Sequence, residues 1–358
     1  MMRIGRFFVL VLIFAVLGAA SVARPAAGWD AEGHRIVTLL ALERLPPAAA
    51  ASLLRDPGFR EGVAFLSNEA DRWRATVTPP IGHENKPDHY IDLELLSEYA
   101  LGPATLPSFR YDYLAAMAVA RHDNPGRVSP YDRSRDRDRS LEWPGFLPHA
   151  IVEHHAKLEA SLRTLRILES LGPRARPAEL EAARASVAVE MGHVSHFAAD
   201  AAQPLHTTKH FNGWAGDNPE GYTTDKGFHA LIDGGLIARH GVTAELVRPR
   251  VVSGRSIDAR APWPAVMEHV LRAFERVEPL YRLEKSGDLQ KDAGRDFVVE
   301  RLADAAGFLA ALYGAAWEAS APTEEQIAKF LEYDGRREPG SAPGPAPGPR
   351  PGEEKPGG

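Results

Sequence analysis

The chain of 358 residues contains no cysteine. It therefore has no disulfide bond to stabilise it and no thiolate with which to bind a metal ion. Alternating β-branched patterns are scarce, and phosphate-binding glycine loops, nucleophile elbows and kinase signatures are missing from the sequence. These absences argue against P-loop enzymes, kinases and α/β-hydrolases, so any chemistry must come from other residue types.

Long apolar runs are almost absent as well. The one that exists, Phe7 to Ala20, follows the basic residues Arg3 and Arg6 and precedes a stretch of small residues. It is too short to span a bilayer and has the layout of a secretory signal peptide. We therefore expect residues 1–28 to be removed from a secreted or periplasmic protein. Cleavage after Ala23 and cleavage after Gly28 both fit, and the second would make Trp29 the first mature residue.

The charge balance is acidic. The net charge is −6, and removal of residues 1–28, which hold three arginines and no acidic residue, would make it −9. Such a surface disfavours stable binding to duplex DNA, which depends on basic residues that displace counterions. It leaves room for cleavage of a short or single-stranded phosphodiester, because bound cations reverse the local field.

Proline and glycine dominate residues 336–358, which we expect to form a disordered tail. Residues 29–335 have the length of one large domain. Within them, helical periodicity predicts long helices over 31–45, 148–171, 177–202, 262–282 and 290–317. The intervening segments at about 78–110, 122–147 and 207–227 are predicted to be long loops. The sequence thus predicts a single all-α domain.

Histidine and aspartate pairs stand out near the middle of the chain. His196 and Asp200 are spaced i,i+4, and so are His229 and Asp233. On a helix this spacing brings both side chains to one face, where they can bind one ion. Pro204 ends the first helix and turns His206 back toward the same place. Imidazole and carboxylate groups are typical zinc ligands, so the pattern predicts a metal site.

Three further candidates lie upstream. His34 is in the segment Trp29-Asp-Ala-Glu-Gly-His, Asp71 in Ala-Asp-Arg-Trp-Arg, and His89 in His-Tyr-Ile-Asp. Downstream of these segments the chain continues with His-x-x-x-Asp-x-x-Gln-Pro-Leu-His and a final His-x-x-x-Asp. Taken in this order, the motifs resemble those of the phospholipase C and single-strand nuclease superfamily. That superfamily includes the secreted trinuclear-zinc nucleases of the mung-bean type and the bacterial zinc-dependent phospholipases C.

The resemblance implies an all-α fold that holds three zinc ions. It implies that the first ion is bound by Asp71, His89, His196 and Asp200, and the second by His206, His229 and Asp233. The third would be bound by the amino group and carbonyl of Trp29, His34 and the second oxygen of Asp200. Asp200 would therefore bridge two ions.

The resemblance also implies catalytic and substrate-binding residues. Asp71, Asp200 and Arg74 would be catalytic, with Arg74 neutralising the scissile phosphate, although an arginine on a surface helix would fit the sequence nearly as well. Tyr90 and Asp92 match positions that stack on a base and bind its edge, although Tyr90 could simply pack behind His89. Among the remaining histidines, His210 is a candidate for substrate contact, His193 is expected to support the site or to pack, and His154 is expected to be an ordinary helix residue.

The expected activity is hydrolysis of phosphoester bonds by a monomeric single-strand endonuclease and 3′-nucleotidase. Its partners would be single-stranded nucleic acid or nucleotides. Two segments are more similar to the phospholipase branch: Pro-Leu-His-Thr-Thr, which follows Gln203, and Gly-Phe-Leu-Pro-His-Ala-Ile-Val-Glu, which begins at Gly145. A phospholipase C acting on a phospholipid headgroup ester is therefore the alternative enzyme. A non-catalytic zinc-binding protein is the alternative from another class.

Overall fold

The computed structural model describes residues 29–76, 78–252, 254 and 256–336. The expected signal peptide and residues 337–358 of the expected tail lie outside the described residues. Within those ranges the chain forms helices and no β-strand, apart from one isolated bridge between Ile91 and Gly145. The predicted all-α fold class is confirmed.

Long and very short helices alternate along the chain. The α-helices are α1 (Ala31–Leu42), α2 (Pro47–Leu53), α3 (Pro57–Leu66), α4 (Glu69–Arg74), α5 (Pro79–Asn85), α6 (Arg110–Asp123), α7 (Leu147–Ser170), α8 (Pro177–Asp200), α9 (Phe228–Ala230), α10 (Leu236–His240), α11 (Ala244–Val247), α12 (Trp263–Phe274), α13 (Val277–Lys285), α14 (Asp292–Ala319) and α15 (Glu324–Tyr333). Short 3₁₀ turns include η1 (Lys86–His89), η2 (Leu93–Tyr99) and η6 (Pro204–His206), and the π-helical turn η7 (Leu231–Gly235) links α9 to α10.

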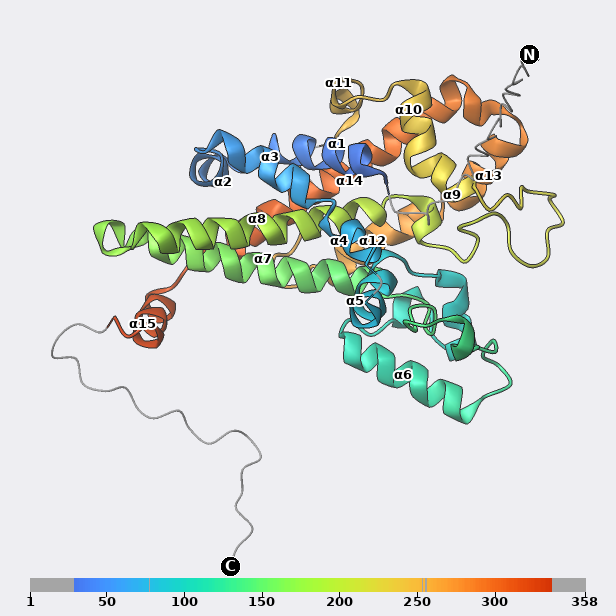
Figure 1. The fold of residues 1–358 in the computed structure, drawn as a ribbon, viewed down its shortest axis with the longest axis horizontal. Helices are drawn as coiled ribbons and strands as arrows, with labels where there is room; N and C mark the ends of the chain where they lie inside the picture. Colours follow the sequence, from blue (N-terminus) through green and yellow to red (C-terminus); the bar gives the residue numbers. More distant parts are fainter. Residues whose placement is uncertain (1–28, 77, 253, 255, 337–358) are drawn as a thin grey trace, which may run out of the picture.

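Three long helices form the centre of the molecule. In Figure 1, α7 and α8 lie side by side, and α14 runs behind them. Helix α14 contacts α1, α7 and α8, and α8 is also covered by α3. Because α14 has neighbours on several sides, most of its apolar residues from Phe297 to Ala316 belong to the main hydrophobic core. This packing leaves the C-terminal end of α8 surrounded by short elements.

Proline and aspartate set the starts of several helices. Pro47, Pro57, Pro79 and Pro177 each stand in the first turn of a helix, where no intrahelical partner is needed for a backbone N–H. Helix α1 begins where the Asp30 carboxylate accepts a hydrogen bond from the backbone N–H of Gly33. This cap fixes the direction of α1 directly after Trp29.

Two boundary predictions were wrong. The predicted helix over 262–282 is divided into α12 and α13, because Pro279 has no N–H to continue the helix and its ring collides with the carbonyl four residues earlier. The predicted loop over 78–110 contains α5, η1 and η2. These turns are too short to produce a visible helical period. The segment 207–227, by contrast, forms no regular helix, as expected.

None of the described helices is, on its own, both long enough and apolar enough to cross a membrane. Only α1 and α2 taken together reach that length and hydropathy, and they meet at a bend of 117°.

A close approach between α8 and the end of α3 depends on Gly192. A Cβ atom at this position would lie 2.7 Å from Leu66 Cβ and 2.8 Å from the Leu66 carbonyl carbon. The neighbouring Ser67 carbonyl accepts a hydrogen bond of 2.8 Å from His196 Nδ1. The absence of a side chain at Gly192 therefore allows the backbone contact that orients His196.

We expect Gly192→Ala to lower the free energy of unfolding by about 1–3 kcal/mol, because the added methyl group overpacks a rigid backbone contact. Gly62→Ala in α3 is the matched control, since a Cβ there meets no atom within 4 Å. The control should be neutral or slightly stabilising. Denaturant unfolding of both variants measures the difference, and equal stability of Gly192→Ala and the parent chain would contradict the role of this contact.

Candidate metal centre

The predicted side-chain ligands converge from six segments that span residues 31 to 235. Helix α8 contributes His196 and Asp200 from its last turns, and α1 contributes His34; all three are completely buried. The remaining ligands lie on α4, η1, η6 and the α9–η7 turn, namely Asp71, His89, His206, His229 and Asp233. They form three groups in which the donor atoms lie within 4.8 Å of one another.

The first group joins α1 and α8. His34 Nε2 lies 3.4 Å from Asp200 Oδ1, and His196 Nε2 lies 3.4 Å from Asp200 Oδ2. Ligands about 2.0–2.1 Å from a tetrahedral zinc ion are separated from one another by ~3.4 Å. The two oxygens of Asp200 thus face two different imidazoles at the separation that two zinc sites require.

The second group joins α4, η1 and α8. His89 Nε2 lies 3.5 Å from Asp71 Oδ1, and His196 belongs to the same group. His196 is therefore shared between the first and second groups, next to the divided carboxylate of Asp200. The structure thus brings three of the four residues expected for the first zinc ion into one group, and Asp200 adjoins this group through His196.

The third group consists of His206, His229 and Asp233. The Nε2 atoms of the two histidines are 3.0 Å apart, and His229 Nε2 lies 3.4 Å from Asp233 Oδ2. His229 and Asp233, which are spaced i,i+4, remain close to each other although the backbone changes from the α-helical α9 to the π-helical η7 between them. Gln203 donates a 2.6 Å hydrogen bond to Asp233 Oδ1, so that the second oxygen, Oδ2, is the one directed at the group.

Backbone carbonyls orient three of the imidazoles. His89 Nδ1 bonds to Asn85 O, His196 Nδ1 to Ser67 O, and His206 Nδ1 to His89 O. These bonds fix the rings so that Nε2 points into the donor groups, which is the usual arrangement behind a metal-bound histidine. Near Asp200, the Trp29 indole N–H donates to Ala199 O at 3.0 Å, and this bond anchors the residue expected to contribute the third site's backbone ligands.

Many of the candidate donor atoms have no hydrogen-bond partner among the described residues. Both nitrogens of His34, Nε2 of His89 and His196, both oxygens of Asp200 and Oδ2 of Asp233 are buried in this state. An unpaired polar atom in a helical core costs free energy, and a cation would satisfy several such atoms at once. The imidazole and carboxylate donors therefore fit zinc, and the structure gathers them into groups that could hold metal ions.

The titration behaviour of the ligands is consistent with cation binding. Burial lowers the pKa of His206 to about 4 and that of His89 to about 3, so both rings are neutral and available as ligands at neutral pH. Burial raises the pKa of Asp200 well above its ordinary value, and the Asp71 charge adds to this effect. A dication between these groups would offset the cost of ionising Asp200.

Arg74 lies at the rim of the second group. Its Nη1 atom is 3.2 Å from Asp71 Oδ1, and the two side chains are 22% and 15% exposed. The guanidinium is thus next to a predicted ligand while part of it faces solvent. It can neutralise an anion that approaches the metal groups from outside.

Tyr90 and Asp92 line a hollow of about 150 Å³ together with Tyr99, Tyr131 and Trp143. The Tyr90 hydroxyl donates to Ser140 O at 2.8 Å. Asp92 Oδ1 has no hydrogen-bond partner in the described part of the chain, and burial together with the Glu94 charge raises the pKa of Asp92 to about 8. This carboxyl is therefore largely protonated at neutral pH and can donate as well as accept.

His210 lies outside the three donor groups. Its ring stacks on Trp214 with centroids 3.9 Å apart, and its Nδ1 accepts a hydrogen bond from Ala215 N. The neighbouring Phe211 has its ring centroid 6.0 Å from that of His229. His210 therefore holds the 207–227 loop in place beside the third group.

A fourth group of potential ligands was missed in the sequence. It consists of His154 on α7 with Glu190 and His193 on α8. The signal that could have revealed it is the Glu-x-x-His spacing, which brings Glu190 and His193 to one helix face. His154 gives no comparable signal, because only the packing of α7 on α8 brings it there.

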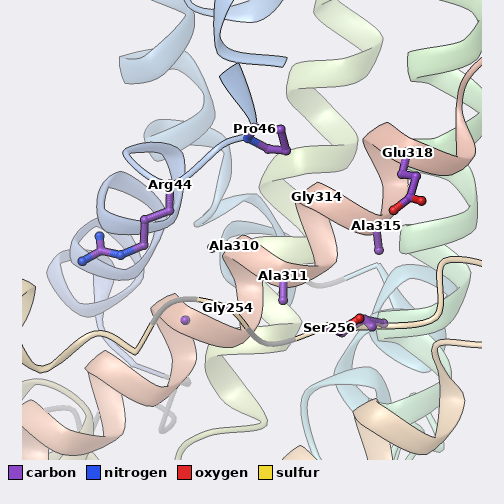
Figure 2. A pocket seen from close by; sticks show the side chains of 11 residues that line it. Arg44, Pro46, Gly254, Ser256, Ala310, Ala311, Gly314, Ala315 and Glu318 are labelled. Carbon is purple, nitrogen blue, oxygen red and sulfur yellow. The ribbon is translucent and has the colours of Figure 1, made fainter. Parts of the chain in front are cut away.

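A larger hollow lies away from all of these groups. It has a volume of about 490 Å³ and opens over α14, where Ala311 and Gly314 line it between Arg44 and Glu318 (Figure 2). None of its lining residues is a predicted ligand. The size of a pocket alone therefore does not identify the candidate metal centre in this chain.

Comparison with protein-family models gave no match to the chain. Curated proteins gave no significant match either.

Removal of metal should destabilise the protein, because the buried donors would lose their shared cation. After treatment with EDTA we expect the midpoint of thermal unfolding to fall by at least about 5 °C. Zinc should restore it, whereas magnesium should not, since magnesium disfavours imidazole ligands. Thermal unfolding with the metal content measured in parallel checks this, and an unchanged midpoint in fully stripped protein would count against structural metal.

Proposed function

We propose that the protein is a secreted, zinc-dependent phosphodiesterase that cleaves single-stranded nucleic acid and 3′-nucleotides, and that it belongs to the superfamily its motifs resemble. One observation carries the proposal. Three groups of buried donors converge on the end of α8, and Asp200 presents one oxygen to His34 and the other to His196. A constellation of this kind suits two or three neighbouring ions better than one structural ion.

Zinc held by these residues would supply Lewis acidity and lower the pKa of water so that it could act as a nucleophile near neutral pH. The residues of the chain provide the rest. The backbone carbonyls behind His89, His196 and His206 fix the ligand rings, so little reorganisation is needed when substrate binds. Asp71 stays ionised: burial acts to raise its pKa, but the His89 imidazole 3.5 Å away and the Arg74 guanidinium 3.2 Å away lower it well below its ordinary value.

Arg74 is the group that favours catalysis over simple zinc storage. Its guanidinium lies 3.2 Å from Asp71 Oδ1 and remains partly exposed. In that position it can hold a phosphoryl oxygen and offset the negative charge that develops during substitution at phosphorus. A protein that only sequesters zinc would gain nothing from a cation beside its ligands, because the cation weakens metal binding.

The hollow beside Tyr90 favours nucleic acid over a choline phospholipid. Its aromatic rings could stack on a base of any identity, and the protonated Asp92 could bind a base edge. An aromatic cage for a quaternary ammonium group needs an open ring face. Here the Arg121 guanidinium already covers the Trp143 ring, with its Cζ atom 4.0 Å from the ring centroid. Like charge would oppose a choline headgroup at that place.

A substrate panel tests the proposed function. Zinc-loaded protein is assayed against single-stranded DNA, a 3′-nucleotide, duplex DNA and phosphatidylcholine vesicles. We expect cleavage of the first two, with products that carry 5′-phosphates from the single strand. Asp200→Asn, prepared in the same way, controls for contaminating nucleases. Release of phosphocholine without nuclease activity would show that the protein is a phospholipase C instead, and inactivity on all four would reject the proposal.

The two helix-borne aspartates should respond differently to the same change. Asp200→Asn removes a charge that faces two imidazoles, whereas Asp233 has one oxygen already bonded to Gln203 and serves one group. We expect Asp200→Asn to lower kcat/KM by more than about 100-fold and to reduce the zinc content at two sites. Asp233→Asn should lose one ion and less activity. Equal losses of zinc and turnover would show that Asp200 does not bridge.

A further inference from the structure

The group formed by His154, Glu190 and His193 lies on the α7–α8 interface, away from the three groups described above. Glu190 and His193 face His154 across that interface, and each of the three residues offers a donor atom within 4.8 Å of the others. On α8, His193 precedes His196 by three residues, so this group lies about one turn before the metal centre. It shares no residue with the other groups.

His193 is the member of this group whose ring nitrogens lack hydrogen-bond partners in the described part of the chain. It is 4% exposed, and both of these nitrogens are buried. Its ring lies between His154 and Trp73, with centroid distances of 4.6 and 4.9 Å. Aromatic contacts explain why the ring is buried, but they leave two polar atoms unsatisfied at a cost in free energy. A cation bound to one nitrogen would remove part of that cost.

Glu190 supplies the negative charge that such a cation needs. Burial acts to raise the pKa of Glu190, but the hydrogen bond and charge of His154 outweigh burial and lower it. The carboxylate is therefore ionised at neutral pH. Lys157 is the neighbouring cation that opposes metal binding, and its charge acts on both Glu190 and His193. One carboxylate and two imidazole rings beside one lysine still form a donor set suited to a dication.

The geometry needs only a small adjustment. His154 Nδ1 and Glu190 Oε2 are 2.8 Å apart, which is a hydrogen-bond distance and shorter than the ~3.4 Å between two ligands of a tetrahedral zinc ion. Their side chains are 12% and 19% exposed, so they can separate without disturbing the core. The same exposure gives an ion a route from solvent, while His193 forms the buried end of the site.

We propose that His154, Glu190 and His193 form an additional site for a divalent transition-metal ion, with zinc as the principal occupant. Two imidazoles and one carboxylate suit zinc and its first-row neighbours, and they disfavour calcium and magnesium, which prefer oxygen ligands. Three protein ligands would leave a position for water. The site does not rest on the proposed function, because it depends on a separate set of residues.

The location suggests which part of the molecule such an ion would stabilise. Trp73 belongs to α4, the helix that also carries Asp71 and Arg74. Its indole N–H donates to Glu69 Oε1 at 3.1 Å, and its ring contacts His193. An ion on His193 would therefore hold the ring against which α4 packs.

Zinc content per chain tests the site. The full chain, Glu190→Gln and His154→Gln are equilibrated with the same micromolar excess of zinc, separated from free metal, and analysed for zinc and protein. Glu181→Gln on α8 and His122→Gln on α6 are matched controls, because both residues are exposed and belong to no donor group. We expect each site variant to hold one zinc ion fewer than the full chain and both controls to hold the same number.

The core ligands provide the second comparison. Asp200→Asn should lose zinc from the core groups, and adding Glu190→Gln to it should remove one further ion. Circular dichroism checks that every variant keeps its helical content. Unchanged zinc content in both Glu190→Gln and His154→Gln would overturn the site. A loss of several ions in these two variants would overturn it as a separate site, because their residues would then be supporting the core groups.

Discussion

Burial of ionisable candidate metal ligands inside a helical core is the constraint on which the rest of the structure depends. His34, His196 and Asp200 have no solvent exposure, and their donor atoms have no hydrogen-bond partners among the described residues. In an apolar interior, a carboxylate in this state is far less stable than it is in water. Cations shared among the donors would turn that penalty into a source of stability, and so the fold and the metal centre are expected to depend on each other.

Helix α8 is the element that organises this centre. Its last turns carry two ligands, Gly192 lets it approach the end of α3, and the Ser67 carbonyl reached by that approach orients His196. The other ligands lie on short elements that end or begin beside α8, such as α4, η1 and η6. Short turns place side chains at angles that one long helix cannot offer, because a single helix face presents only residues three or four apart.

Charged and neutral groups are distributed unevenly around the candidate metal centre, and this distribution bears on the binding of an anionic substrate. The acidic chain concentrates neutral imidazoles and buried carboxyls around one region, with Arg74 at its rim beside Asp71. Burial keeps the imidazoles available as ligands, and it leaves the carboxyls dependent on a nearby cation for their charge. Positive charge would therefore gather where an anionic phosphoester could approach, although the molecule as a whole is negative.

Much of the centre could be predicted from the sequence because helical spacing is local. The pairs His196/Asp200 and His229/Asp233 follow from the i,i+4 rule, and the all-α class follows from the periodicity of the long helices. The long helices α7, α8 and α14 were located to within a few residues. Short elements such as α5 and η2 were missed, because one or two turns give no measurable period.

Only the tertiary structure decided how residues from different helices meet. It directed the two oxygens of Asp200 at two different histidines, and it packed α7 on α8 so that His154 met Glu190 and His193. Spacing along the chain carries no information about such contacts, since they arise from packing between distant segments. The sequence by itself determined the long helices and the residue types of the candidate metal ligands, and long-range packing determined which of these residues lie together.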